Sequence, residues 1–237
     1  MATTVYSLLA EDADFVINQL GTYGPVGGRH EGRGGWSWST YINPAYELTP
    51  CSTKTNAFMY NGVLDFQHYC QINSYSGIDY FIIGLGTNDV NQGATLQTDA
   101  SIAAIIANAK TFINALLSSD KGFPNCKIAI GLPAVGAPIF TSNTNADIFR
   151  KSIQMLNKAY IDTFDNGKYN ANVTTVMHGA YIDRVNSYQY TDVARSTRMT
   201  SSTIREYTNN VHPSAVGYQQ WGDGIYAKIR AFMSGII

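Results

Sequence analysis

The stretch that decides the fold is Asp79-Tyr80-Phe81-Ile82-Ile83-Gly84-Leu85-Gly86-Thr87-Asn88-Asp89. Residues 79–85 are a nearly continuous apolar run, which is typical of a parallel strand that is buried on both faces. Glycine interrupts the run, and a polar turn follows it. Because sites in open parallel sheets lie beyond the carboxyl ends of the strands, we expect this strand to deliver Asn88 and Asp89 to a site.

The rest of the chain alternates between apolar runs and amphipathic stretches. Strands are predicted at residues 14–20, 79–85, 127–132 and 173–177, and helices at residues 3–13, 97–117, 146–164 and 213–233, with a short helix starting within residues 36–41. This alternation predicts βαβ units and an α/β fold, a three-layer α/β/α sandwich around a parallel sheet. Residues 43–76 are expected to form an irregular excursion beside a site, and residues 181–208 a long polar loop. Residues 1–237 are predicted to form one domain.

The composition excludes several classes of protein. The chain has 237 residues, 45% of them hydrophobic and 14% charged, which is enough for a substantial core. A formal net charge of −1 gives no electrostatic footprint for nucleic acid or an anionic membrane. No apolar run approaches the roughly 18 residues of a spanning helix, so neither membrane nor nucleic acid is an expected partner. The first residues do not resemble a signal peptide. The compartment stays open, and the Tyr- and Gly-rich composition favours an extracellular, secreted or virion-associated one.

Cysteine and histidine spacing gives no sign of a metal site. Cys51, Cys70 and Cys126 are an odd number and contain no Cys-x-x-Cys pair, which disfavours a zinc knuckle or a disulfide scaffold. One bridge between Cys51 and Cys70, or two or three buried thiols, are both compatible with the sequence. The 4 histidines also lack metal-ligand spacing. We expect no metal and no cofactor.

Two further loops carry polar groups toward the same predicted edge of the sheet. The stretch His30-Glu31-Gly32-Arg33-Gly34-Gly35-Trp36-Ser37 follows the first predicted strand, and Val211-His212-Pro213 precedes the last predicted helix. Proline suits the first turn of a helix, so His212 is expected on the loop that enters that helix. Alone, His212 is an ordinary loop residue; with partners on the other loops it becomes a candidate catalytic base.

These three stretches resemble three of the four motif blocks of the SGNH (GDSL-type) hydrolase superfamily. Its members are serine esterases and lipases with a flavodoxin-like fold, and many of them deacetylate carbohydrates. The resemblance covers nearly the whole chain in order and spacing. It implies that the Gly35 N–H and the Asn88 side-chain amide stabilise an oxyanion. It also implies that His212 is the general base and then the general acid, without a cofactor.

One departure from the family concerns its opening block, a strand that ends in Gly-Asp-Ser. That block is absent from the chain. We therefore expect an N-terminally incomplete chain that lacks its first central strand. In the sheet, this strand would lie between the predicted strands at residues 14–20 and 79–85. An upstream segment or a partner chain would complete the sheet and supply the nucleophilic serine. Ser37 is the fallback nucleophile, although Ser7, Ser37 and Ser39 all lack the Gly-x-Ser-x-Gly elbow sequence.

A second departure concerns the partner of His212. The family places an aspartate three residues before the histidine, and here that residue is Asn209. An amide cannot stabilise an imidazolium as a carboxylate does, and in serine proteases the equivalent change lowers turnover roughly 10⁴-fold. A backbone carbonyl, or Asp183 or Asp192 from the preceding loop, could orient the imidazole instead. Asp89 is a further candidate for a secondary role.

The substrate is predicted from the residues around the second block. Trp36, Arg33 and His30 are candidates for substrate contacts, and Tyr46 lies close to them in sequence. The rings either stack on sugars or belong to the core, and Arg33 and His30 either contact substrate or pin the loop through Glu31.

Two hypotheses follow for the whole chain. The first is a serine esterase that removes O-acetyl or other acyl groups from carbohydrate. The second is an inactive module of the same fold that binds glycans or serves a structural role in a cell-surface or virion appendage. A nucleotide-binding fold is disfavoured, because no glycine-rich phosphate loop follows the first strand.

Overall fold

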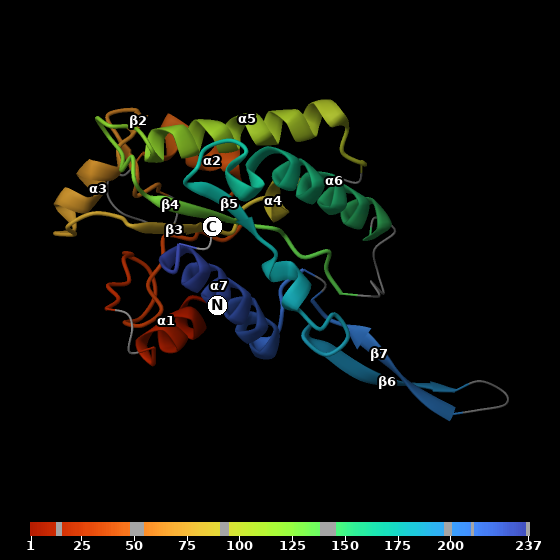
Figure 1. Ribbon diagram of the computed structural model, residues 1–237. Helices are drawn as coiled ribbons and strands as arrows, with labels where there is room; N and C mark the ends of the chain where they lie inside the picture. The colour runs from red at the N-terminus through yellow and green to blue at the C-terminus, as the bar shows by residue number, and fades with distance from the viewer. Residues whose placement is uncertain are drawn as a thin grey trace.

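The computed structural model describes residues 1–12, 16–47, 55–90, 95–137, 146–196, 201–209 and 211–235. Its centre is a parallel sheet in the order β3 (Tyr80–Ile83), β4 (Lys127–Gly131) and β5 (Val173–Val176). Helices α5 (Asp99–Leu116) and α6 (Ala146–Phe164) cover one face, and α1 (Ala2–Ala10) and α7 (Ala215–Met233) cover the other (Figure 1). The predicted α/β class is confirmed.

Alternation along β4 explains why both faces of the sheet are buried. Ile128 and Ile130 belong to the main core, together with residues of α5 and α6 such as Phe112 and Ile153. Ala129, which points the other way, packs with residues that include Phe232 of α7. Strands buried on both faces are mostly apolar, and this is why the apolar runs predicted them, although β5 carries two buried threonines, Thr174 and Thr175.

The long helices begin at capping residues. Thr98 accepts a hydrogen bond from the backbone of Ser101 and so starts α5 two residues after the predicted start. Ser214 caps α7, which therefore begins at Ala215 and not at Pro213. Helix α6 has its predicted bounds. No helix in the described residues is both long and apolar enough to cross a membrane.

The prediction of a strand at residues 14–20 is wrong for residues 16–20, which form no strand; the two residues before them lie outside the described ranges. A side chain of this segment makes hydrogen bonds to other parts of the chain instead: the Gln19 amide donates to the Ala2 carbonyl (3.4 Å) and accepts from the Arg29 N–H (3.1 Å). Val16 is 99% exposed. An apolar run becomes a strand only where a neighbouring strand pairs with it, and no described strand pairs with this one.

The predicted irregular excursion at residues 43–76 contains regular elements. They are η1 (Pro44–Tyr46), the hairpin of β1 (Met59–Tyr60) and β2 (Val63–Leu64), and α3 (Phe66–Ile72). Glu47 holds the turn of that hairpin by accepting from the N–H groups of Asn61 (2.6 Å) and Gly62 (2.7 Å). Cys70 and Cys126 are buried free thiols, and Cys51 lies outside the described residues.

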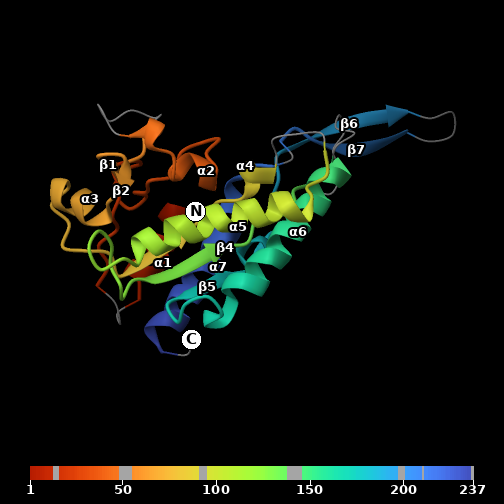
Figure 2. The same cartoon turned by 90° about the horizontal axis from the view of Figure 1, so that it is seen from above.

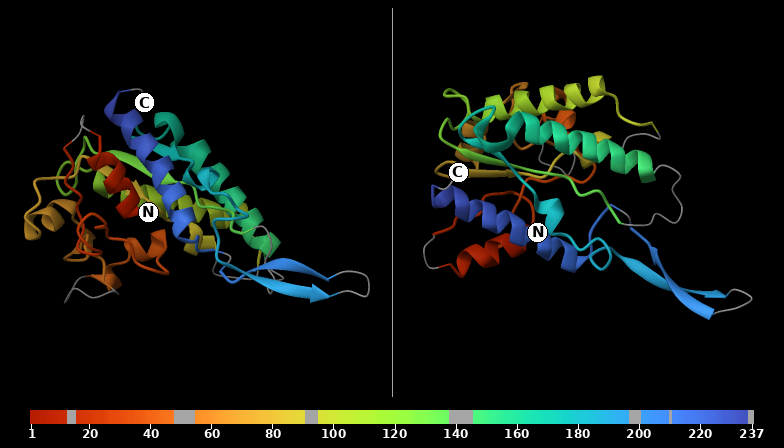
Figure 3. Two further views of the ribbon diagram at one scale, coloured as in Figure 1. Left: turned by 90° about the horizontal axis from the view of Figure 1, so that it is seen from below. Right: turned by 45° about the vertical axis from the view of Figure 1, so that its right-hand side comes forward.

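The prediction of a loop at residues 181–208 is wrong. Strands β6 (Tyr190–Ser196) and β7 (Ser201–Tyr207) pair in antiparallel register, and the hairpin projects from the body of the molecule (Figures 1, 2 and 3). Between Thr191 and Tyr207 the sequence is rich in threonine, serine and arginine, so it lacks the apolar run of a core strand. Cross-strand pairing such as Val193 with Ile204 still forms a ladder in solvent.

The two outer strands of the parallel sheet, β3 and β5, differ in whether the backbone groups at their outer edges have hydrogen-bond partners. On β5, the N–H of Val173 donates to Asn170 (2.9 Å) and that of Thr175 donates to Asp165 (3.4 Å), at the start of η2 (Asp165–Gly167). On β3, the Asp79 carbonyl accepts from the Lys127 N–H of β4 (2.8 Å). Since a parallel strand alternates the direction of its backbone groups, those of Tyr80 and Ile82 point to the other edge. No described residue hydrogen-bonds them there.

A buried histidine fills the space between the sheet and α7. His178 begins η3 (His178–Tyr181) after β5, and its ring lies 4.8 Å from that of Trp221. A Cβ on Gly131 would be 1.8 Å from the ring, so β4 needs glycine at that position. Burial lowers the pKa of His178 from its ordinary 6.5 to about 4. Its Nδ1 has no hydrogen-bond partner in the described structure.

Replacing Gly86 by alanine is expected to lower the free energy of unfolding by about 2–4 kcal/mol. Gly86 has a φ of +117°, and a Cβ there would lie 2.8 Å from the Tyr160 hydroxyl and 2.9 Å from a Leu156 methyl group. Gly84→Ala is the matched control, because its Cβ would have no neighbour within 4 Å. Urea unfolding measures both, and equal losses in the two variants would contradict the strain at Gly86.

Acid is expected to destabilise the fold through His178. The unfolded chain binds this proton near pH 6.5, whereas the folded chain binds it only near pH 4. Stability from neutral His178 is therefore complete above pH 6.5 and falls as the pH drops toward 4, by at most about 3 kcal/mol. Urea unfolding between pH 4 and 7 measures how the free energy of unfolding changes with pH. His178→Gln should remove the part of this change that comes from His178. An unchanged pH dependence in the variant would contradict the role of His178.

Candidate functional site

The turn after β3 brings the second and third sequence blocks together. Helix α4 (Thr87–Val90) follows Gly86 directly and carries Asn88 and Asp89. The Asn88 side chain donates a hydrogen bond to the Trp36 carbonyl, with 3.0 Å between Nδ2 and O. A side-chain amide has two N–H groups, so the second N–H of Asn88 remains available to a ligand.

Asp89 makes the second link between these blocks. Its carboxylate accepts from the Trp38 N–H at 3.1 and 3.3 Å, at the first turn of α2 (Trp38–Tyr41). Burial raises the pKa of the Asp89 carboxyl to about 6, and the hydrogen bond from Trp38 offsets part of that rise. Asp89 therefore ties α2 to α4, and its ionisation has a cost in stability.

Gly35 offers an unused backbone donor beside Asn88. Its φ is +80°, which favours glycine, and a Cβ would meet no atom within 4 Å. Its N–H has no hydrogen-bond partner among the described residues. Gly35 and Asn88 line the same hollow of about 550 Å³, whose remaining lining residues are Trp36, Ser37, Ser39, Thr40, Tyr46, Asp89, Ala104, Ile105 and Asn108. Two free donors thus lie on the wall of one hollow.

Arg33 and His30 hold the loop and do not line this hollow. Glu31 accepts from the Arg33 guanidinium (3.1 Å), the Thr22 N–H (2.6 Å) and the Tyr69 hydroxyl (2.8 Å). The Arg33 side chain is 2% exposed. His30 accepts from the Gly32 N–H through Nδ1 (3.0 Å). Of the three predicted substrate contacts, only Trp36 reaches the hollow.

His212 is held at the base of the projecting hairpin. Beyond the β6–β7 ladder, the Thr208 N–H donates to the Gln189 carbonyl (2.9 Å). Tyr188 and Pro213 form an isolated antiparallel β-bridge. His212 lies between this ladder and α7 in the chain, and it is exposed to solvent. Within the described residues, no hydrogen bond or ion pair joins the His212 imidazole to Asn88, Gly35 or any acid.

The predicted orienting groups are engaged elsewhere. The side-chain Oδ1 of Asn209 accepts from the N–H groups of Val211 (3.2 Å) and His212 (2.9 Å), so it is engaged by the backbone before α7. Asp183 accepts from the Val185 N–H (2.9 Å) in its own turn. Asp192 pairs with Arg205 across the hairpin (3.8 Å). Asn209 sets the position of His212 through the main chain.

The serines near the site have structural partners. Ser37 caps α2, and its hydroxyl is hydrogen-bonded with those of Ser39 (2.8 Å) and Thr40 (2.9 Å). Ser214 caps α7. None of these serines hydrogen-bonds with a histidine in the described part of the chain. The described residues also contain no cluster of three or more histidine, cysteine or acidic side chains that could hold a metal ion.

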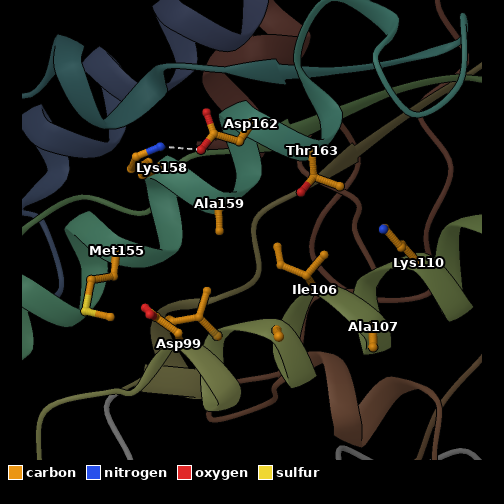
Figure 4. A pocket seen from close by; sticks show the side chains of 11 residues that line it. Asp99, Ile106, Ala107, Lys110, Met155, Lys158, Ala159, Asp162 and Thr163 are labelled. Carbon is orange, nitrogen blue, oxygen red and sulfur yellow. Dashed lines mark hydrogen bonds and ion pairs between the residues drawn. The ribbon is translucent and has the colours of Figure 1, made fainter.

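A second hollow of about 500 Å³ lies between α5 and α6 (Figure 4). Its walls include Ile106 and Ala159, with Lys110 at the rim and an ion pair between Lys158 and Asp162. It contains none of the predicted site residues. The hollow beside Asn88 is therefore the candidate site.

Two residues of this site carry no recognisable sequence signal. Asn108 and Ala104 come from the middle of α5, where nothing in the sequence distinguishes a site-facing position from a solvent-facing one. Only the packing of α5 against α2 brings them to the hollow, so no motif could have identified them.

Comparisons with known proteins give one structural likeness. No protein-family model matches the sequence, and no curated protein matches it. The chain is similar in structure to Est24, a carbohydrate acetylesterase from Sinorhizobium meliloti. The identity is 18%, the TM-score is 0.43, and the match covers 81% of this chain and 75% of that chain. A likeness of this size carries no argument about activity.

Neutralising Asp89 is expected to stabilise the protein above pH 6. The folded carboxyl has a pKa of about 6 and the unfolded one about 3.8, so ionisation costs the folded state stability as the pH rises between these values. The loss is at most about 3 kcal/mol. Asp89→Asn keeps an acceptor for the Trp38 N–H and should remove this loss. Urea unfolding at pH 4.5 and 7.5 measures it; a variant no more stable than the wild type at pH 7.5 would contradict it.

Proposed function

We propose that this chain is a serine ester hydrolase of the SGNH type, which removes O-acetyl or other acyl groups from carbohydrate once a nucleophilic strand is present. One observation carries the proposal: Asn88 donates to the Trp36 carbonyl at 3.0 Å. That bond brings the Asn88 amide and the neighbouring Gly35 N–H to one hollow at the carboxyl end of β3. Two preorganised donors aimed at one position can stabilise the oxyanion of an ester's tetrahedral intermediate.

The roles of the remaining residues follow from their chemistry. A serine hydroxyl attacks the ester carbonyl, and His212 takes its proton. The negative charge that forms on the carbonyl oxygen is held by Gly35 and Asn88. When this oxygen reforms its double bond, the bond from the acyl carbon to the sugar oxygen breaks, and His212 gives its proton to that oxygen, so the sugar leaves as an alcohol and the acyl group stays on the serine. Water then repeats the sequence to free the serine.

The edge of β3 supports the idea that the serine comes from elsewhere. Tyr80 and Ile82 leave their backbone groups without described partners there, whereas β5 has its edge satisfied by Asn170 and Asp165. An added parallel strand would pair with this open edge and make β3 a central strand of a three-layer, flavodoxin-like sandwich. Its carboxyl end would arrive at the edge of the sheet where β3 delivers Asn88.

A second candidate is an inactive module of the same fold that binds glycans. One observation favours it. No described acid hydrogen-bonds or ion-pairs with the His212 imidazole, and the side-chain Oδ1 of Asn209 accepts from the backbone N–H of His212. A histidine without a carboxylate partner is a weaker base.

Hydrolysis of p-nitrophenyl acetate separates these candidates. The chain alone should be inert, and the chain extended before Met1 by an apolar strand ending in Gly-Asp-Ser should be active. In the extended chain, Asn88→Ala should lower kcat about 10²–10³-fold through loss of an oxyanion donor. His212→Ala and serine-to-alanine in the added strand should abolish activity.

Two results would contradict the proposal. Enzyme-like hydrolysis by the unextended chain that depends on His212 would mean that a serine of this chain is the nucleophile. A folded extended chain that binds glycans but hydrolyses no ester would favour the inactive module.

A further inference from the structure

The hollow beside Gly35 and Asn88 extends well beyond the two donors. Its volume of about 550 Å³ falls within the roughly 300–1,000 Å³ of small-molecule sites. Besides the two donors, its lining includes Tyr46 of η1 and Ala104, Ile105 and Asn108 of α5. An ester group is much smaller than this volume, so the hollow has room for the group to which the ester is attached.

The charge of the lining disfavours anionic ligands. No lysine, arginine or histidine lines the hollow, so nothing there would neutralise an anion. Asp89 is the one acid among the lining residues, and its carboxylate accepts from the Trp38 N–H. This lining therefore favours a neutral ligand over an anionic one.

Several uncharged polar groups point to a ligand with many hydroxyls. The Asn108 amide, the Tyr46 hydroxyl and the Asn88 carbonyl oxygen have no hydrogen-bond partners among the described residues. An amide and a phenol both donate and accept, and this matches hydroxyl groups, which do the same. These groups come from η1, α4 and α5, so they surround the hollow on separate elements.

Tyr46 adds an apolar surface. Its side chain is 37% exposed although it lines the hollow, and the ring of Trp36 braces it at 5.3 Å between centroids. Trp36 is itself buried. A ring that is fixed from behind and open in front can pack against the C–H face of a sugar.

We infer that this hollow is a subsite for a neutral sugar ring, which stacks on Tyr46 and hydrogen-bonds to Asn108. The inference rests on the proposed function for its geometry, because it places the acyl group of that sugar at Gly35 and Asn88. It adds the residues that select the substrate. It also holds for a chain that binds sugar without hydrolysing it, so binding can be measured on the chain as it exists.

Saturation-transfer NMR tests the subsite with the methyl glycosides of glucose, galactose, xylose and N-acetylglucosamine at millimolar concentration. At least one should receive magnetisation from the protein. Tyr46→Ala and Asn108→Ala should each weaken its binding about tenfold. Tyr46→Phe should retain most of the affinity, because it keeps the ring.

The matched control is Tyr60→Ala. Tyr60 is another exposed tyrosine, 42% accessible, but it stacks on His68 outside the hollow, so its loss should leave binding unchanged. Circular dichroism of each variant confirms the fold. No transfer to any of the glycosides, binding of glucose 6-phosphate alone, or full binding by folded Tyr46→Ala and Asn108→Ala would each overturn the subsite.

The outcomes also separate this inference from the proposed function. Sugar binding that survives His212→Ala, without hydrolysis by the strand-extended chain, leaves the subsite standing and removes the esterase. Hydrolysis of p-nitrophenyl acetate by the extended chain, without sugar binding, leaves the esterase standing and removes the subsite.

Discussion

The contact between α4 and the loop before α2 holds the candidate site together. Asn88 and Asp89 bind the Trp36 carbonyl and the Trp38 N–H, across more than 50 residues of sequence. Because the contact satisfies backbone groups at the start of a helix, it fixes the loop that carries Gly35. It also buries the Asp89 carboxyl, whose pKa rises to about 6. The site is thus built at some cost in stability at neutral pH.

The sequence predicted the buried part of the fold and missed the parts that depend on neighbours. The strands at the centre are mostly apolar, and the amphipathic helices α5 and α7 begin at capping residues, so local patterns were sufficient for both. Residues 16–20 contain Val16, Ile17 and Leu20 and were predicted as a strand, yet no described strand pairs with them. The β6–β7 hairpin shows the converse, because its polar residues pair with each other outside the core.

The candidate site divides in the same way. Gly35 and Asn88 follow sequence motifs, and the structure brings them to one hollow. The sequence left two roles open for Arg33, a substrate contact or an anchor of its loop through Glu31, and the structure pairs the buried Arg33 guanidinium with Glu31. Asn108 could not be found, since a position in the middle of a helix acquires its role only through packing. His212 lies in the segment before the last helix, as predicted, and this segment follows the base of the β6–β7 hairpin.

In the proposed function, the open edge of β3 is where an added strand would complete the site. Amide hydrogen exchange of this strand, measured by NMR, tests it residue by residue. The account predicts slow exchange at Phe81 and Ile83, which face β4, and fast exchange at Tyr80 and Ile82 in the chain alone. Addition of the Gly-Asp-Ser strand should slow exchange at Tyr80 and Ile82. Equal protection of all four amides in the chain alone, or no change when the strand is added, would contradict the claim that this edge receives the nucleophile.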